Sequence, residues 1–119
     1  MSQPFNPGDI LAFQLESGFG LIRILGVDET EGNTVWHVSV YEDLFPDVES
    51  AEKALEQIHS LRLSEPHLAL TERAFERTPA AKLRNIPLQD SELAAYRTWQ
   101  DSAERRVLDR SLLLLLGMR

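Results

Sequence analysis

Three apolar stretches near the N-terminus decide the fold of this chain: Asp9 to Leu15 (DILAFQL), Phe19 to Val27 (FGLIRILGV) and Thr34 to Tyr41 (TVWHVSVY). Each is short, rich in β-branched or aromatic residues, and preceded by a turn signal that contains glycine, serine or asparagine. Runs of this kind, joined by short turns, are typical of β-hairpins. Three in a row predict an antiparallel β-meander.

The third stretch indicates which residues form the core. Trp36, Val38 and Val40 alternate with His37, Ser39 and Tyr41, so the two sets point to opposite faces of a strand. We expect the apolar set to be buried together with Leu11, Phe13, Leu21 and Leu25. In the second stretch, Gly20 and Gly26 are expected to mark bulges or bends.

The hydrophobic period changes to a helical one after Phe45-Pro46. Asp47 or Ser50 can cap a helix over about Glu49 to His59. The stretches 61–63 and 67–71 alternate again and can return to the sheet.

A second helix is expected to begin at Asp90 or Ser91 and to continue to Val107. It would place Arg106 and Arg110 on one helix face, paired with Glu104 and Asp109. Residues 112–116 are all leucine, so periodicity does not distinguish a helix from a strand in this stretch.

These elements predict an α+β fold, with an N-terminal antiparallel β-meander and two helices packed against it. An open SH3-like barrel is one form that such a meander can take. The chain has 119 residues, 43% of them hydrophobic and 26% charged, which fits one globular domain over 1–119.

Charge is distributed unevenly along the chain. The net charge is −7, yet residues 1–60 carry 11 acidic residues against only Arg23 and Lys53, whereas residues 61–119 carry 8 acidic and 10 basic residues. An acidic surface repels phosphate backbones, so nucleic acid is not an expected partner. A basic protein is a better match, although a charge of this size also serves solubility alone.

The absence of cysteine excludes disulfides and thiolate chemistry and fits a reducing compartment. The N-terminal residues show no signal-peptide pattern, and the longest apolar run, residues 112–116, is far shorter than the roughly 20 residues that span a bilayer. We therefore expect a cytoplasmic protein without a membrane partner. A homo-oligomer is compatible with the sequence.

Two stretches resemble a known group of proteins. The Pro7-Gly8-Asp9 opening before a strand, followed by Phe19 to Leu25 (FGLIRIL), resembles the immunity-like proteins of bacterial polymorphic-toxin systems, some of which begin with a small SH3-like barrel. The stretch Asp90 to Trp99 (DSELAAYRTW) is similar to a helix of related uncharacterised bacterial proteins. The resemblance implies a role in binding another protein and assigns no functional residue.

The acidic connection after the third strand is the most informative candidate site. Six acids fall between residues 42 and 56, offset only by Lys53, beside large apolar side chains. Such a mixture is typical of a binding loop, in which aromatic groups supply contact area and acids attract a basic partner. The predicted partner-binding residues are Tyr41, Glu42, Asp43, Phe45 and Asp47. The alternative is a helix entrance that favours acids through its dipole, with Leu44 and Phe45 packed into the core.

No pattern predicts catalysis, a cofactor or a metal. His37, His59 and His67 lack the spacings of local metal sites, and motifs for nucleophilic serine or phosphate binding are missing. His37 and Ser39 share a strand face but lack an acid to orient them. The two tryptophans, Trp36 and Trp99, are expected to anchor the core or an interface.

These observations together predict a non-enzymatic protein-binding module, immunity-like in the sense of the resemblance, that holds a basic protein on its acidic surface. The alternative is a small ligand-binding domain or enzyme with a pocket at the mouth of the barrel, near Trp36, His37 and Tyr41.

Overall fold

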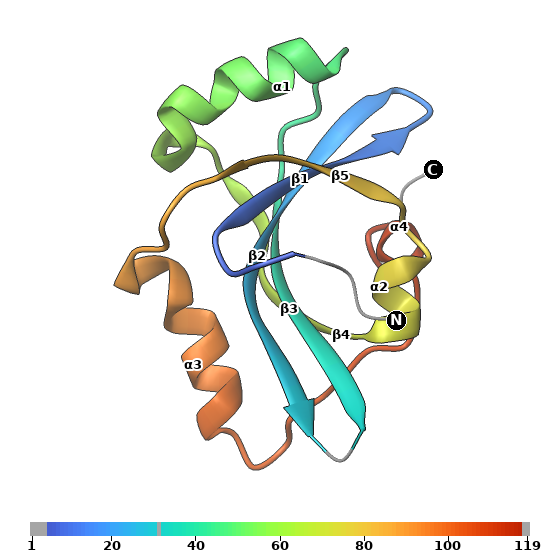
Figure 1. Ribbon diagram of the computed structural model, residues 1–119, viewed down its shortest axis with the longest axis vertical. Coiled ribbons are helices and arrows are strands. Elements are labelled where there is room, and N and C mark those ends of the chain that lie inside the picture. The colour runs from blue at the N-terminus through green and yellow to red at the C-terminus, as the bar shows by residue number, and fades with distance from the viewer. Residues whose placement is uncertain (1–4, 31, 118–119) are drawn as a thin grey trace.

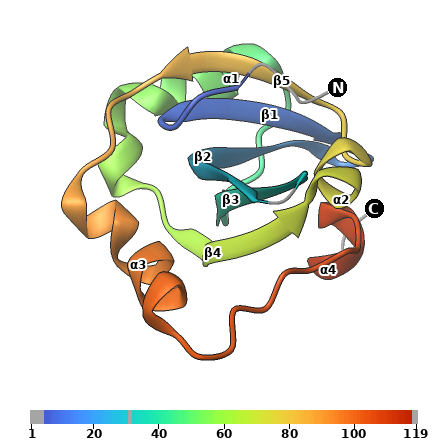
Figure 2. The same cartoon turned by 60° about the horizontal axis from the view of Figure 1, so that its bottom comes forward.

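The computed structural model describes residues 5–30 and 32–117 and confirms the α+β prediction (Figure 1). Strands β1 (Asp9–Leu15), β2 (Gly18–Thr30) and β3 (Asn33–Tyr41) form the predicted antiparallel meander. Strands β4 (Leu63–Thr71) and β5 (Ala80–Asn85) extend it at opposite edges, in the order β4-β3-β2-β1-β5. The strongly curved sheet is not closed, because β4 and β5 remain its two edges (Figure 2).

The two glycines of β2 have different roles. The register between β2 and β3 shifts between Ile24 and Gly26, which confirms an irregularity at Gly26. Gly20 pairs with Phe13 in unbroken register, so of the predicted bulge or bend, a bulge between β1 and β2 is wrong. A Cβ atom on Gly20 would lie 2.4 Å from Cζ of Phe13, so the missing side chain makes room for this ring.

The first predicted helix is present but changes type along its length. Helix α1 (Val48–Ala54) is followed by the 3-10 helix η1 (Leu55–Ser60), with a non-helical residue at Gln57. A short helix not expected from the sequence, α2 (Glu72–Glu76), connects β4 to β5.

The second predicted helix is shorter than expected. The 3-10 helix η2 (Asp90–Leu93) leads into α3 (Ala94–Asp101), and Ser102 is already extended. The expected continuation to Val107 is therefore wrong, and Arg106 and Arg110 do not share a helix face. The run of leucines is a helix, α4 (Leu112–Leu115). Among the residues that the structure describes, no helix has both the length and the apolar character needed to cross a bilayer.

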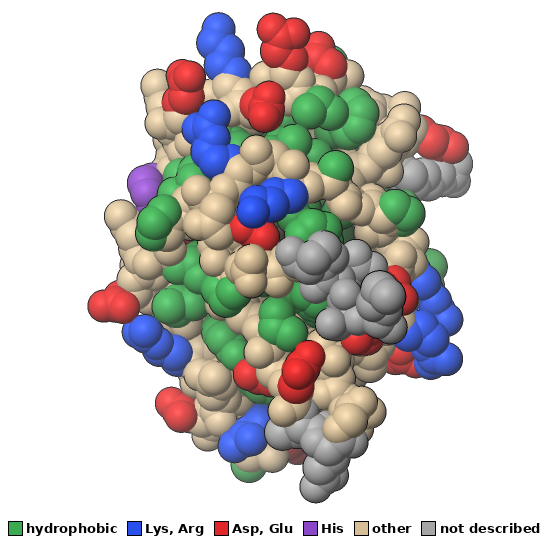
Figure 3. Space-filling view, viewed as in Figure 1, with side chains coloured by type: hydrophobic (Ala, Val, Ile, Leu, Met, Phe, Trp, Pro, Cys, Tyr) green, Lys and Arg blue, Asp and Glu red, His purple; other side chains and the backbone are tan. Residues whose placement is uncertain are grey.

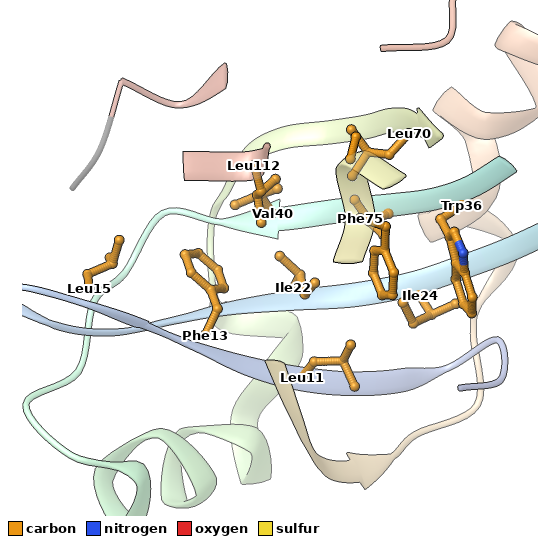
Figure 4. Packing of buried hydrophobic residues seen from close by; sticks show 12 residues of the cluster. Leu11, Phe13, Leu15, Ile22, Ile24, Trp36, Val40, Leu70, Phe75 and Leu112 are labelled. Atoms are coloured by element: carbon orange, nitrogen blue, oxygen red, sulfur yellow. The ribbon is translucent and has the colours of Figure 1, made fainter. Parts of the chain in front are cut away.

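Both faces of the sheet are covered. One face carries the main core, in which Leu11, Phe13, Trp36, Val38 and Val40 pack together as predicted, against side chains from β4, α2 and α4 (Figure 4). The other face packs on α1 and η1 near one end and on α3 near the other (Figure 1). Leu21 and Leu25 are buried as predicted, but Leu21 belongs to the second face. Double coverage explains why the alternate residues of β3 are buried as well.

Candidate functional site

The structure separates the five residues predicted to bind a partner into buried and exposed groups. Tyr41 is 5% exposed and packs beneath α1 and η1 with Ile10 and Leu55. Phe45 is half-buried, and its backbone pairs with that of Phe19 in both directions, at 2.7 and 2.8 Å. Glu42, Asp43 and Asp47 are exposed, so they line the outer side of the connection while the two aromatic residues anchor it.

Asp47 caps helix α1, which selects it from the two predicted candidates, Asp47 and Ser50. The Ser50 backbone amide donates a 2.7 Å hydrogen bond to Oδ1 of Asp47, and this bond holds the pKa of the Asp47 carboxyl below its ordinary value. The carboxylate therefore has a structural role that coexists with any role in binding.

We use the name acidic face for the six acids of residues 42–56. Its members are all exposed, and none takes part in an ion pair among the described residues: Glu42, Asp43, Asp47, Glu49, Glu52 and Glu56. Leu44 and Val48, exposed by 40% and 38%, lie on the same connection. A groove of about 510 Å³ runs beside α1 and η1, lined by Phe45, Ala54 and Leu61 among others. Figure 3 shows acidic, basic and hydrophobic side chains next to one another at the α1 end of the molecule.

A second arrangement, which the sequence did not reveal, joins a buried histidine to a half-buried one. His37 on β3 is fully buried, and its Nε2 lies 2.8 Å from Oδ2 of Asp28 on β2. Its Nδ1 lies 2.9 Å from Nε2 of His67 on β4. The two imidazole rings stack at 5.2 Å between centroids. We call Asp28, His37 and His67 the histidine chain.

The protonation of the histidine chain follows from its geometry. Burial lowers the pKa of His37, although the Asp28 carboxylate acts in the opposite direction, so the ring is neutral near pH 7. Burial, followed by the neighbouring His37, lowers the pKa of His67 to about 4. Because the Asp28 carboxylate only accepts, the proton of neutral His37 resides on Nε2, and His37 Nδ1 accepts from Nε2–H of His67. His67 Nδ1 is then an unprotonated acceptor.

Helix α3 covers the histidine chain with two aromatic rings. Tyr96 stacks on His37 at 4.2 Å between centroids, and its hydroxyl donates to the Asp28 carboxylate at 3.1 Å. Burial and then the Asp28 charge raise the pKa of Tyr96 to about 12. Trp99 meets His37 edge-on at 4.7 Å. Gly26 permits this approach, because a Cβ atom there would lie 2.8 Å from the Tyr96 ring.

The same geometry limits the chemistry available. Both nitrogens of His37 are engaged with Asp28 and His67, so His37 does not activate the buried Ser39 on the same strand face. Within the described residues, no three His, Asp or Glu side chains are arranged to hold a metal ion. The pocket expected near Trp36, His37 and Tyr41 does not bring the three together, because Trp36 stacks on Phe75 in the core of the opposite face.

Helix η2 and the segment before it are fixed by a buried cation. Arg23 on β2 is fully buried, forms an ion pair with Glu92, and donates to the carbonyl oxygens of Ile86 and Pro87 at 2.6 and 3.2 Å. The predicted pairing of Asp109 with arginines of its own helix is wrong, because Asp109 pairs with Arg73 of α2.

One sequence signal could have located the histidine chain. Residues 37, 39 and 41 form a polar strand face, and the amphipathic pattern of Tyr96 and Trp99 offers an aromatic cover for it. His67 and Asp28 could not be added to this face without the strand register, which places His37 opposite Ala69 and Gly26.

Comparison with protein-family models gives no match for this chain, and comparisons with curated proteins and with solved structures give none either.

Proposed function

We propose that this protein is a non-enzymatic binding module that holds a basic protein on its acidic face. The observation that supports the proposal is that the six acids are exposed and free of cationic partners among the described residues. Carboxylates that are not neutralised within the chain attract a basic surface over a distance of about 8 Å at physiological salt.

Apolar contacts beside the acids would supply affinity that charge alone does not. Leu44 and Val48 are exposed next to the acidic face, and the groove along α1 and η1 can accept an apolar side chain of the partner. An apolar centre with a charged rim is typical of protein interfaces. The contact residues in this proposal are Glu42, Asp43, Asp47 and the half-buried Phe45, with Tyr41 as buried support beneath them.

The resemblance to immunity-like proteins extends the proposal to the nature of the partner, a toxin whose binding surface is basic. Capture of such a toxin together with loss of its activity in the complex would support this extension. The broader proposal, a protein-binding module for a basic partner, does not depend on it.

Charge reversal tests the acidic face. Changing Glu42, Asp43 and Asp47 to Lys alters the local charge by six units, and the matched control changes the exposed Glu76, Asp101 and Glu104 to Lys. Proteins captured from the native lysate by both the wild type and the control, but not by the acidic-face variant, are expected to be basic. With one such protein purified, association should slow mainly in the acidic-face variant, most strongly at low salt, with a smaller change in dissociation.

Two further measurements separate binding from folding. Melting curves establish that each variant is folded, and Asp47→Asn removes the charge while keeping a side chain that can cap α1. Equal capture and equal association rates for the folded acidic-face variant and its control, across the salt series, would contradict the proposed function.

A further inference from the structure

A cavity of about 420 Å³ lies between β4, α3 and the segment that follows α3. It shares no lining residue with the groove beside the acidic face, so it is a separate feature. Its volume falls within the roughly 300–1,000 Å³ of small-molecule sites. Its lining includes Glu65 and His67 of β4, Trp99 of α3, Arg106, Leu108 and Leu115.

The walls of this cavity are held in place by hydrogen bonds. Nε1–H of Trp99 donates to the Arg106 carbonyl oxygen at 2.8 Å, which fixes the indole ring. Leu108 is bound to β4 on both sides, since its amide donates to Ala69 at 2.8 Å and its carbonyl oxygen accepts from Thr71 at 3.0 Å. A ligand would therefore enter a largely preformed site, which reduces the entropy lost on binding.

The histidine chain ends at this cavity and determines what His67 offers to a ligand. His67 Nε2 is occupied by the fully buried His37, whose tautomer is set in turn by Asp28. The ring nitrogen left for a ligand is Nδ1, which makes no hydrogen bond to any described residue and carries no proton in this tautomer. His67 lines the cavity, so Nδ1 is the acceptor that this side chain can offer to a ligand there.

The remaining lining residues restrict the ligand further. Trp99, Leu108 and Leu115 provide an aromatic and aliphatic surface suited to a flat apolar ring. Glu65 and Arg106 contribute one negative and one positive charge to the same lining, so neither an anion nor a cation is favoured by net charge.

We propose that this cavity binds a small uncharged aromatic molecule that carries a hydroxyl group, of the phenol class. The hydroxyl donates its hydrogen to Nδ1 of His67, and the ring packs against Trp99 and the leucines. Asp28 and His37 act as positioning residues, because they hold His67 in the tautomer that accepts.

A panel of ligands of nearly equal size tests the chemistry. The probes are 4-methylphenol, toluene, 4-methylbenzoate and 4-methylbenzylammonium, titrated into the full chain and followed by NMR of the His67 ring and the Trp99 indole. One net hydrogen bond corresponds to roughly two- to twelvefold in affinity, so 4-methylphenol should bind about fivefold more tightly than toluene. Both ions should bind more weakly than 4-methylphenol. Equal binding of toluene, tighter binding of either ion, or no binding of 4-methylphenol would overturn the proposal.

Two variants and one spectroscopic signature locate the acceptor. His67→Phe keeps an aromatic ring but removes the acceptor, so the preference for 4-methylphenol over toluene should disappear, whereas His59→Phe, at an exposed histidine outside the cavity, should retain it. Should His67→Phe fail to fold, the wild type still decides: the ¹⁵N shift of His67 Nδ1 must change with 4-methylphenol and not with toluene. An unchanged shift at saturation would overturn the assignment. Lysine substitutions at Glu42, Asp43 and Asp47 change no residue that lines the cavity, so the result of this test is independent of the result for the acidic face.

Discussion

Trp36 shows how one residue supports the main core. Its indole is 1% exposed, stacks on Phe75 at 4.4 Å with an interplanar angle of 10°, and meets Phe5 edge-on. Its Nε1–H donates to Glu72 of α2 at 3.3 Å. The side chain therefore links β3 to α2 and fills the space between them.

Truncation of Trp36 to Ala should lower the free energy of unfolding by roughly 3–5 kcal/mol, because it leaves a large cavity and removes the partner of Phe75. That is a large part of the roughly 5–15 kcal/mol typical of a domain. Urea unfolding measures the change, with Leu114→Ala, at a leucine that is 65% exposed, as the control that should stay close to wild type. A Trp36→Ala protein as stable as wild type would show that the indole does not carry the core.

At the scale of elements, the ion pair between the buried Arg23 and the half-buried Glu92 fastens the segment of residues 86–93 to the sheet. Arg23 also donates to two backbone carbonyl oxygens of that segment, and Glu92 accepts from the Gln89 amide at the start of η2. Through η2, this anchor sets where α3 lies over the histidine chain.

Neutralising one partner should therefore be costly. Glu92→Gln leaves the Arg23 charge buried without its counter-ion, and the free energy of unfolding should fall by on the order of 3 kcal/mol. The control is Asp90→Asn, which breaks the exposed pair with Arg97 and should cost less than about 1 kcal/mol. The double variant Arg23→Met/Glu92→Gln should recover much of the loss, because no unpaired charge remains buried. Equal effects of Glu92→Gln and Asp90→Asn in urea unfolding would contradict this account.

At the scale of the whole molecule, the histidine chain couples global stability to pH. The folded-state pKa of His67 is about 4, below the ordinary 6.5, and that of His37 is lowered too. Between pH 4 and pH 6.5 the unfolded chain therefore binds a proton at His67 that the folded chain does not bind. Stability is therefore complete above pH 6.5 and falls as the pH drops towards 4.

For His67 alone, this dependence amounts to up to about 3 kcal/mol at 1.36 kcal/mol per pKa unit. Unfolding measured from pH 7.5 to 4.5 should show the decline in the wild type and in His59→Gln, and a much weaker one in His67→Phe. Ordinary carboxyl groups begin to titrate near the lower end of this window, but the His59→Gln and His67→Phe proteins carry the same carboxyl groups, so the difference between their pH profiles reports on His67. A wild-type stability that stays constant between pH 7 and 5 would show that the histidines are protonated without cost in the fold.

Local sequence by itself determined the meander, two candidate caps of which Asp47 is the one used, the helical region after it and the part of the main core that the meander supplies. Each of these depends on neighbours within a few residues: turn residues between short apolar runs, alternation along β3, and a side chain that accepts a bond from the amide three positions on. The acidic face could also be predicted from the sequence, because its residues form one continuous stretch. The burial of Tyr41 at the start of this stretch could not be predicted in the same way.

Only the tertiary structure decided the pairing of β4 and β5, the end of α3 at Asp101, and the interior position of Arg23 and His37. These features depend on contacts between residues far apart in sequence, such as Arg23 with Glu92, 69 positions apart, and His37 with His67, 30 positions apart. A polar residue on a strand predicts a solvent-facing side unless another element covers it. Here α3 and η2 cover that side, and the hydrogen bonds that they and the neighbouring strands provide make burial of these polar groups possible.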